Sequence, residues 1–429
     1  LHCFASFLRS IYRRRHCFSL FLRLIFTLLR FCQKSKDKQT MMISELPRDL
    51  EAEILSWVPA RYLQKLKPTC KRWYTLFKDP GFLKKNLARL ERELLSLMNY
   101  KLCSISVNLP GIHNSVDPFV DFSGILNSKK DPEDVKIFDI SQCNGVLLCT
   151  TKDMRLIVWN PSTGQMRWIP CRSSSPYSLV HKYALGYENN NESCYSYRIL
   201  RYHQSYGNLG DEFGIYEFNS DSWRSFYDFS PNCSLQSKGV TLKGNTYWFA
   251  SDVQDPFVNF VLRFDFTTKR FGRLSLPFQS DDVDGVVETV VLSVVREEKL
   301  ALLYERFDDD TDGSEMKIWV TNTKIEEAKD LSWSDFLVVD FSKLMITGMT
   351  NVRSFLVDEE KKMVMFCDTD TNDQYMTRVF IVGEDIYQEV YNETAIGESF
   401  CYWPRLISYA PSLVQIQQGQ VNPGCKRKR

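Results

Sequence analysis

The sequence is poor in the residues and spacings that build metal sites and disulfide frameworks. It has 429 residues but only five histidines, and no Cys-x-x-Cys pair occurs among its 13 cysteines. An odd number of irregularly spaced cysteines is not typical of small secreted domains, so we expect reduced thiols. Because no histidine is spaced with cysteine as a zinc ligand, we expect no metal and no other cofactor.

Local motifs of catalysis are missing as well. The chain has no Gly-x-Ser-x-Gly, no Walker-type loop, no His-Glu-x-x-His and no Gly-x-Gly-x-x-Gly after a strand pattern. Such motifs are the local signatures of many hydrolases and nucleotide-binding enzymes. Cys143 and Cys149 lie close in sequence, and we interpret them as buried core thiols rather than as a redox pair. We therefore expect a protein that is not an enzyme.

Long uninterrupted apolar runs are also absent. Residues 17–32 form the most apolar stretch, but two arginines interrupt it, and a membrane span needs about 20 mostly apolar residues. We interpret residues 1–40 as sequence upstream of a native start at the Met41-Met42 pair. A transit peptide and a basic amphipathic helix at a membrane surface are the alternatives. We expect no membrane partner.

The net charge of +1 is the sum of segments of opposite sign. Residues 1–40 hold nine basic residues and one acid, whereas the chain between this leader and the last four residues holds 41 bases and 52 acids. This distribution excludes a uniformly basic nucleic-acid-binding protein as the first interpretation, and we expect no direct contact with nucleic acid.

The chain ends in a short basic run. It consists of Lys426, Arg427, Lys428 and Arg429. Such a run can act as a nuclear import signal, or it can be a disordered, solubilising tail. We expect localisation in the nucleus, the cytoplasm or both.

Residues 41–88 have the pattern of a small helical module. Ser44 can cap a helix whose first turns hold Pro47 and several acids, and apolar residues then recur at helical spacing. We expect three short helices, with Pro68 able to kink the second. Fewer than 50 residues bury little core, so the module either completes its core against a partner or forms a small self-contained subdomain.

This module resembles an F-box. The residues that carry the resemblance are Leu46-Pro47, Leu50, Ile54-Leu55, Val58-Pro59, Leu63, Leu66, the Cys70-Lys71-Arg72-Trp73 block, Phe77 and Phe82. The resemblance implies docking onto a Skp-type adaptor and, through it, onto cullin and a RING protein. The implied adaptor contacts are Leu46, Pro47, Ile54, Leu55, Val58, Pro59, Leu63 and Trp73. Among such residues, Trp73 and Leu66 are the ones that we expect in the module's own core.

Beyond residue 100 the hydrophobic period changes from helical to alternating. One unit recurs, in which a strand, a polar turn and a second strand with an aromatic residue follow each other. Its copies span 156–169, 213–226, 261–274, 316–336 and 379–390. Each copy follows further strand sequence, at 145–150, 183–202, 239–251, 289–306 and 354–368.

The spacing of the aromatic markers indicates the fold. Trp168, Trp223, Phe271 and Trp333 are 55, 48 and 62 residues apart. Periods of about 50 residues with about four strands each predict an all-β kelch-like propeller of about five or six blades. A sixth blade can be closed by joining 103–109 to 406–416. An open β-sandwich or two stacked domains is the structural alternative.

Two sequence blocks in the first copy resemble the F-box-associated type of propeller that is common in large plant F-box families. They are residues 144–149 (NGVLLC) and 158–164 (VWNPSTG), and Asn-Pro with Thr-Gly builds a tight turn between strands. The resemblance covers roughly residues 140–415, most strongly in the first three copies. It implies that this domain captures the protein to be ubiquitinated.

Two acidic runs are candidates for contact with that protein. They consist of Asp281, Asp282 and Asp284, and of Asp308, Asp309, Asp310 and Asp312. Residues 89–424 hold 32 bases and 47 acids, so a basic face on the partner would be attracted. The alternative is that both runs are solvated loop tips.

The sequence thus predicts a multi-domain protein, in which a small all-α F-box module precedes an all-β propeller. The expected segments are a leader (1–40), the F-box (41–88), a connecting helix with first strands (89–139), the propeller (140–416) and a basic tail (417–429). The predicted function is substrate recognition in a Skp–cullin–F-box ubiquitin ligase. The alternatives are a regulator that sequesters partners without ubiquitination and a copper enzyme on a propeller, which the scarcity of histidine disfavours.

Overall fold

The computed structural model describes residues 48–89, 92–108, 119–125, 135–170, 181–188, 196–203, 212–226, 231–278, 286–308, 313–325, 329–341, 351–370, 376–384, 386–394 and 404–416. The chain divides into two compact units, Leu1–Pro59 and Ala60–Arg429. The leader 1–40, Leu46, Pro47 and the basic tail lie outside the described residues. No helix among the described residues is long and apolar enough to cross a membrane.

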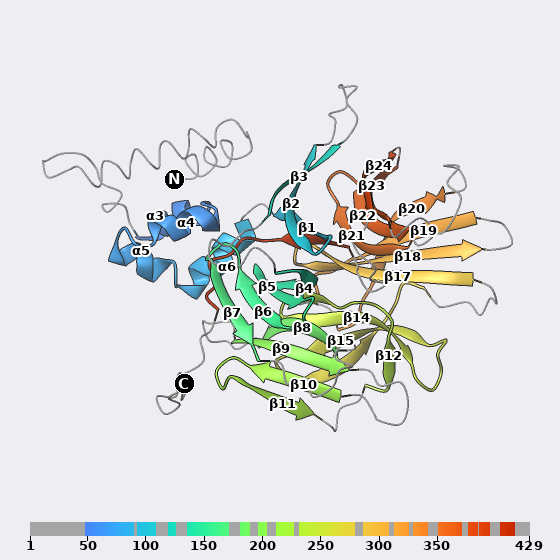
Figure 1. The fold of residues 1–429 in the computed structure, drawn as a ribbon, viewed down its shortest axis with the longest axis horizontal. Helices are drawn as coiled ribbons and strands as arrows, with labels where there is room; N and C mark the ends of the chain where they lie inside the picture. Colours follow the sequence, from blue (N-terminus) through green and yellow to red (C-terminus); the bar gives the residue numbers. More distant parts are fainter. Residues whose placement is uncertain are drawn as a thin grey trace, which may run out of the picture. The chain divides into compact units, whose positions relative to one another are not determined.

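Four short helices occupy the region of the predicted helical module (Figure 1). They are α3 (Arg48–Leu55) in the first unit, and α4 (Ala60–Leu66), α5 (Lys71–Leu76) and α6 (Pro80–Arg89) in the second. The sequence predicted three, because it joined α4 to α5. The break follows from Cys70, which is extended (φ −153°, ψ 153°) and accepts a hydrogen bond from the Trp73 amide on its Sγ at 3.4 Å. Asp79 caps α6 in the same way, through a 2.8 Å bond from the Phe82 amide.

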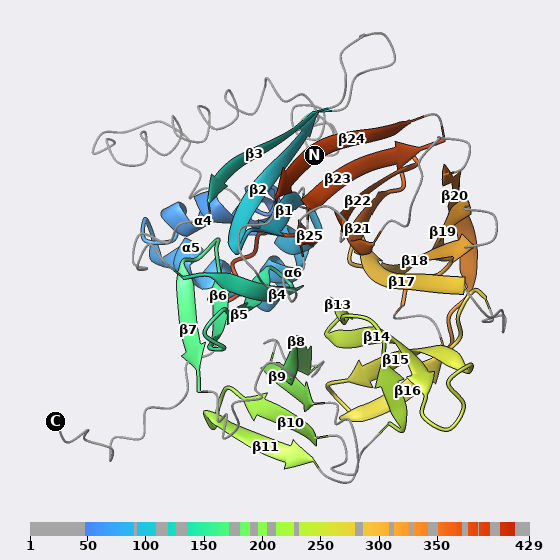
Figure 2. The same cartoon turned by 45° about the vertical axis from the view of Figure 1, so that its right-hand side comes forward.

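The rest of the second unit is a six-bladed propeller, as six separate antiparallel sheets show (Figure 2). Blade 1 is β25 (Arg405–Tyr409), β1 (Glu93–Met98), β2 (Lys101–Asn108) and β3 (Phe119–Ile125). Blade 2 is β4 (Ile137–Cys143), β5 (Val146–Thr151), β6 (Leu156–Asn160) and β7 (Gln165–Ile169). Blade 3 is β8 (His181–Glu188), β9 (Ser196–His203), β10 (Glu212–Glu217) and β11 (Ser222–Phe226).

The remaining blades follow in chain order. Blade 4 is β12 (Cys233–Leu235), β13 (Val240–Leu242), β14 (Asn245–Asp252), β15 (Asn259–Asp265) and β16 (Arg270–Leu274). Blade 5 is β17 (Val286–Val295), β18 (Lys299–Asp308), β19 (Gly313–Thr321) and β20 (Trp333–Asp340). Blade 6 is β21 (Val352–Asp358), β22 (Met363–Asp370), β23 (Met376–Gly383) and β24 (Tyr387–Thr394).

The repeated hairpins predicted from the sequence are confirmed. The five copies correspond to the pairs β6–β7, β10–β11, β15–β16, β19–β20 and β23–β24. The aromatic markers lie on the outermost strands, and two of them secure the connection between blades. The Trp223 indole donates a hydrogen bond to the Pro170 carbonyl at 2.7 Å, and the Trp333 indole donates one to the Ser275 carbonyl at 3.0 Å.

The two ends of the domain meet in blade 1, as the sequence suggested, but through a different strand. β25 pairs with β1, with Leu95 opposite Ile407, and the strand that contains Cys103 is one position farther out. The propeller therefore begins at β1 rather than at residue 140, and no connecting helix follows α6 in the described residues. The apolar run in β1 (ELLSLM) is short enough to fit either a helix or a strand by pattern alone.

The core lies between blades rather than inside a sandwich. Six separate buried clusters each join two neighbouring blades, and together they cover all six neighbouring pairs. Alternation along the strands serves both neighbours, as in β18, where Leu302 faces blade 4 and Leu303 faces blade 6. Cys143 and Cys149 belong to different clusters on opposite faces of blade 2. Both are buried and free, so they form no redox pair.

The Asn-Pro-Ser-Thr turn fastens the C-terminal segment to blade 2. The buried Asn160 accepts a hydrogen bond from the Ser162 amide at 2.9 Å and so shapes the turn. Its side-chain amide donates to the carbonyls of Ser412 and Val414, at 3.1 and 2.8 Å. Gln165 makes two more hydrogen bonds with the same segment. It donates one to the Gln415 side chain and accepts one from the Ile416 amide.

The Asn144-Gly145 turn completes this clasp. Asn144 and Gly145 have φ angles of 49° and 74°, which suit a tight hairpin between β4 and β5. A Cβ at Gly145 would overlap the carbonyl oxygen of Ala410. Ser412 donates a 2.7 Å hydrogen bond to the Asn144 carbonyl. The two sequence blocks of the first repeat thus close the ring.

Candidate interaction surfaces

The predicted adaptor contacts differ in their accessibility. Ile54 and Pro59 are partly exposed, whereas Leu55, Val58, Leu63 and Trp73 are buried, with at most 6% of their surface exposed. The ring centroids of Trp73 and Phe77 are 6.3 Å apart, and those of Phe77 and Phe82 are 5.5 Å apart. These rings form a core for α5 and α6. Leu66 is buried as well. Ile54 and Pro59 are therefore the described candidates that can meet a partner without rearrangement.

An exposed aromatic residue on α5 was not singled out from the sequence. Tyr74 is 47% exposed, and its hydroxyl accepts a 2.7 Å hydrogen bond from Lys78. The Lys67 and Lys78 ammonium groups lie 5.4 and 4.0 Å from the ring centroid, and the hydrogen bond from Lys78 lowers the pKa of the Tyr74 hydroxyl. An exposed aromatic side chain next to two cations is suited to a partner surface that is both apolar and acidic.

The two ends of the propeller ring carry different chemistry. In blades 2, 4, 5 and 6 a short turn follows the innermost strand, which is β4, β13, β17 or β21. We call the end of the ring with these turns the turn end, and the opposite end the loop end. The starts of β4 and β25 share the loop end, where Asp139 lies 3.6 Å from Arg405. The end of β4 and the turn after β17 share the turn end, where Gln142 donates a 2.6 Å hydrogen bond to Glu297.

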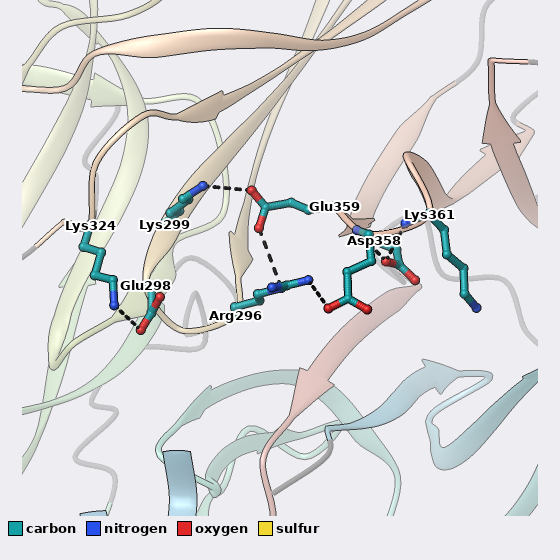
Figure 3. Close-up of polar contacts among 8 residues, drawn as sticks. Arg296, Glu298, Lys299, Lys324, Asp358, Glu359 and Lys361 are labelled. Atoms are coloured by element: carbon teal, nitrogen blue, oxygen red, sulfur yellow. Dashed lines mark hydrogen bonds and ion pairs between the residues drawn. The ribbon is translucent and has the colours of Figure 1, made fainter. Parts of the chain in front are cut away.

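Ion pairs cross the turn end between blades 5 and 6 (Figure 3). Arg296 lies 3.7 Å from Glu359 and 2.9 Å from Glu360. Lys299 reaches Glu359 at 2.9 Å. Within blade 5, Lys324 reaches Glu298 at 2.8 Å. Each acid in these pairs has a basic partner, so the network joins two blades without an excess of either charge.

Glu297, in the turn after β17, carries a further charge that contacts residues of other blades. Burial raises the pKa of the Glu297 carboxyl, although Arg92 lies 3.8 Å away and opposes the shift. Burial also lowers the pKa of the Arg92 guanidinium. Glu297 therefore links blade 5 to β4 through Gln142 and to the residue before β1 through Arg92.

The loop end gathers charged residues from four blades around the axis. Lys238 donates a hydrogen bond to Asp139 at 2.8 Å, and Arg405 approaches the same carboxylate. Lys182, at the start of β8, is close enough for its charge to act on Lys238. Burial lowers the pKa of Lys238 to about 8, and the charge of Arg405 adds to this effect.

An irregularity in blade 4 places Lys238 in this cluster. Residues 236–239 interrupt the innermost strand between β12 and β13. The amides of Gln236 and Ser237 both donate to the Phe249 carbonyl, at 3.0 and 3.3 Å, and the Ser237 hydroxyl accepts from the Phe249 amide at 2.9 Å. This arrangement is a bulge, and it redirects the side chain that follows toward the axis.

Apolar side chains are exposed on a hairpin loop at the loop end of blade 4. Between β14 and β15, Val253 is 61%, Phe257 62% and Val258 47% exposed. The start of the loop is held by an ion pair of 2.6 Å between Asp252 and Arg273. Such large exposed apolar side chains, close in sequence on an ordered loop, are typical of a recognition surface.

The predicted acidic runs flank strands that meet at the same end. The first run precedes β17 and the second follows β18, and Val286 pairs with Asp308. Asp281, Asp282, Asp284, Asp309, Asp310 and Asp312 lie outside the described residues, as does the side chain of Asp308. No group of three or more His, Cys, Asp or Glu side chains that could hold a metal occurs in the part of the chain that the structure describes.

Comparisons with known proteins agree with this architecture. The F-box domain family matches residues 43–85, and the F-box associated beta propeller domain family matches residues 93–416. A putative F-box/kelch-repeat protein of Arabidopsis thaliana is 69% identical over 389 residues, which cover 90% of this chain and 100% of that protein. A second F-box/kelch-repeat protein of the same plant is 47% identical, over 89% of this chain and 97% of its own length.

Solved structures resemble the chain only distantly. A polysaccharide lyase of the ulvan lyase type has 9% sequence identity and a TM-score of 0.38, over 60% of this chain and 71% of its own. A likeness this remote has no bearing on function. The two family matches together cover both the helical module and the ring with its C-terminal clasp.

Proposed function

Because this chain belongs to the plant F-box proteins with an F-box associated β-propeller, we propose that it is the substrate-recognition subunit of a Skp–cullin–F-box ubiquitin ligase. The observation that carries the proposal is the combination of an F-box at 43–85 with a propeller at 93–416. One part would bind the Skp-type adaptor, and through it cullin and the RING protein. The other would hold the protein to be ubiquitinated.

In this role the chain acts by proximity and performs no chemistry of its own. Holding a target beside the ubiquitin-conjugating enzyme raises the effective concentration of the target's lysines. The rigid ring supports this function, because loops on a fixed scaffold can position a partner. We propose that the protein works in the nucleus, the cytoplasm or both.

The adaptor surface in this proposal comprises the residues transferred from the F-box motif. Ile54 and Pro59 are accessible in the described structure, and Leu46 and Pro47 complete the predicted set. The buried members support the helices that present these side chains. The exposed Tyr74 lies on the same motif and is an additional candidate contact.

The target surface in this proposal lies at the loop end of blades 4 and 5. Phe257 and Val258 offer apolar contacts, and the two acidic runs adjoin strands of blade 5 at this end. A partner with an apolar side chain next to basic residues would match both features.

The test separates the two surfaces. The full chain is used to capture a Skp-type adaptor and cullin, and is compared with a Leu46→Ala/Pro47→Ala variant and an Ile54→Ala/Pro59→Ala variant. We expect adaptor and cullin capture by the unmodified chain and its loss in both variants. Failure of the unmodified chain to bring down either protein would overturn the proposal.

The target side is tested with Phe257→Ser/Val258→Ser. We expect this variant to retain the adaptor and to lose the proteins that accumulate when the chain is depleted from cells. Val338→Ser is the matched control, because Val338 is an exposed valine (54%) on the outer strand β20. If adaptor and cullin are captured but no protein accumulates on depletion, the chain is a regulator that sequesters partners without ubiquitination.

A further inference from the structure

The axis of the ring at its loop end has more positive than negative charge. Asp139 on β4 is the acid, and the bases are Lys182 on β8, Lys238 in the bulge of blade 4 and Arg405 on β25. Lys238 and Arg405 both contact the single carboxylate, at 2.8 and 3.6 Å, and Lys182 lies within range of its charge. Three cations therefore share one described anion.

These groups are enclosed by protein but remain open to small solutes. The side chains of Lys238 and Asp139 keep 28% and 32% of their surface accessible. At the same time burial lowers the pKa of Lys238, and it also lowers that of Lys182, although Lys182 is an exposed residue. An accessible cation that is poorly hydrated gains more from a bound anion than one on an open surface.

One donor in this cluster makes no hydrogen bond within the described residues. It is the Arg405 Nε, which lies 3.6 Å from an Asp139 oxygen. The Tyr202 hydroxyl, which is within range of the charges of Asp139 and Arg405, accepts a 3.0 Å hydrogen bond from the Trp248 indole. Tyr202 is buried, with 3% of its surface exposed, so it borders the cluster without meeting a solute.

From this arrangement we propose that the loop end of the ring axis is a binding site for a phosphate-type oxyanion, held by Lys182, Lys238 and Arg405. A dianionic group would balance the two unmatched positive charges, and its several oxygens could accept from donors on different blades. Asp139 would not contact the anion; it positions Lys238 and limits the affinity. The phosphate can be a free ion or a phosphoryl group on a target protein.

This site is independent of the F-box, because all its residues lie in the propeller. Adaptor capture can therefore succeed or fail without affecting it. The site also differs from the apolar loop of blade 4, whose residues Val253, Phe257 and Val258 carry no charge. A phosphoryl group on the target would connect the two surfaces, since both lie at the loop end.

The first experiment measures phosphate binding to the full chain by calorimetry, at pH 7 and at constant ionic strength adjusted with sodium chloride. We expect saturable binding of inorganic phosphate that chloride does not reproduce. Lys238→Met should weaken the affinity about tenfold or more, as loss of a charge-assisted hydrogen bond predicts. Lys299→Met, which removes a lysine from the turn end, is the matched control and should leave the affinity unchanged.

Asp139→Asn gives the decisive result. Removing this carboxylate should strengthen phosphate binding roughly threefold or more, because it takes away a repelling charge without removing a donor. If the cluster had only a structural role, Lys238→Met and Asp139→Asn would both lower the stability of the protein. Neither variant would then bind phosphate more tightly. Circular dichroism identifies a variant that fails to fold, and Arg405→Lys then replaces it, with the charge kept and the Nε donor removed.

Two further arms distinguish the source of the phosphate. A peptide that carries phosphoserine beside an apolar residue is compared with its unphosphorylated form and with inorganic phosphate. Tighter binding of the phosphopeptide than of the free ion assigns the site to a target, and equal binding assigns it to a small anion. No binding by any of these probes beyond that of chloride, or weaker phosphate binding in Asp139→Asn than in the unmodified chain, would overturn the proposal.

Discussion

The two ends of the propeller ring use charge in opposite ways. At the turn end, Arg296, Lys299 and Lys324 each have a glutamate partner within 4 Å, and the pairs of Arg296 and Lys299 join blades 5 and 6. At the loop end, three basic side chains share Asp139. The charges of these turn-end pairs are matched within the fold, whereas the loop end keeps two positive charges that a ligand could balance.

The turn end also contains the closure of the ring. The C-terminal segment after β25 runs along blade 2 and is fixed there by Asn160 and Gln165. A ring closed only by the β1–β25 ladder would depend on one strand pair. The clasp adds a second attachment, so changes at the turn end should affect stability more than recognition.

The largest effect is expected from Gly145→Ala. A Cβ at this position would overlap the Ala410 carbonyl and the Ser412 side chain, and φ is 74°. Steric overlap and backbone strain together should lower the free energy of unfolding by about 4 kcal/mol. Denaturant unfolding measures the loss. Gly164→Ala is the control, because it also has positive φ (68°) but its Cβ would meet nothing within 4 Å.

Gly164→Ala should therefore cost only the strain of the left-handed conformation, about 1 kcal/mol. Equal losses in the two glycine variants would show that the C-terminal segment is not packed against the Asn144-Gly145 turn. The clasp would then contribute nothing to closure, and the assignment of stability to the turn end would be wrong.

Asn160→Ala is expected to have the next largest effect. It removes two hydrogen bonds to the C-terminal carbonyls and the two that its side-chain oxygen accepts from the Ser162 and Thr163 amides in the turn, all at a buried position. Leaving buried partners unsatisfied should lower the free energy of unfolding by about 3 kcal/mol. Hydrogen exchange of the 405–416 amides should accelerate at the same time. A loss of stability without that acceleration would place the role of Asn160 in its own turn alone.

The turn at Asn160 could be predicted from the sequence, but its attachment to the C-terminal segment could not. Residues 158–164 predict a tight turn from their own chemistry, and the turn is present. The second use of Asn160, across 252 and 254 residues, leaves no local pattern. The five predicted hairpins are local in the same sense, because strand alternation and a polar turn lie within one stretch of about 15 residues.

Three features were not predicted from the sequence, and each has its own physical reason. β1 is a run of apolar residues buried on both faces at its end, so no alternation marks it as a strand. The break between α4 and α5 depends on the extended backbone at Cys70. The axial cluster could not be predicted at all, because Asp139, Lys238 and Arg405 are single residues on different blades. Only the closed ring brings them together.

Lys238 gives the third prediction, which concerns pH. The pKa of Lys238 is about 8 in the folded chain, whereas the ordinary value for a lysine, which we take for the unfolded chain, is 10.5. Between these two pH values the unfolded chain therefore binds more protons than the folded chain. Burying the charged Lys238 ammonium therefore destabilises the folded chain. This cost is fully present below pH 8 and disappears as the pH rises toward 10.5. Relative to Lys238→Met, the unmodified chain should therefore gain about 2–3 kcal/mol of stability over this interval.

The comparison with Lys238→Met is needed because other groups titrate nearby. Asp139, Lys182 and Arg405 act on Lys238 through their charges, and all three remain in the variant. Denaturant midpoints at pH 7, 8, 9 and 10 give the difference between the two proteins. A difference that is independent of pH would mean that Lys238 is as well hydrated as a surface lysine. The contrast between the two ends of the ring would then be lost.

The smallest effect is expected at the turn end, from the exposed pair of Arg296 and Glu360. Their side chains are 50% and 80% exposed, so water and salt screen the 2.9 Å ion pair. A double-mutant cycle with Arg296→Gln and Glu360→Gln should give a coupling energy of about 0.5 kcal/mol or less, falling further as salt is added. Phosphate should change it no more than chloride at equal ionic strength, because both charges already have a partner. A coupling above about 1 kcal/mol, or a specific response to phosphate, would show that anions act at both ends and that matched pairing does not distinguish them.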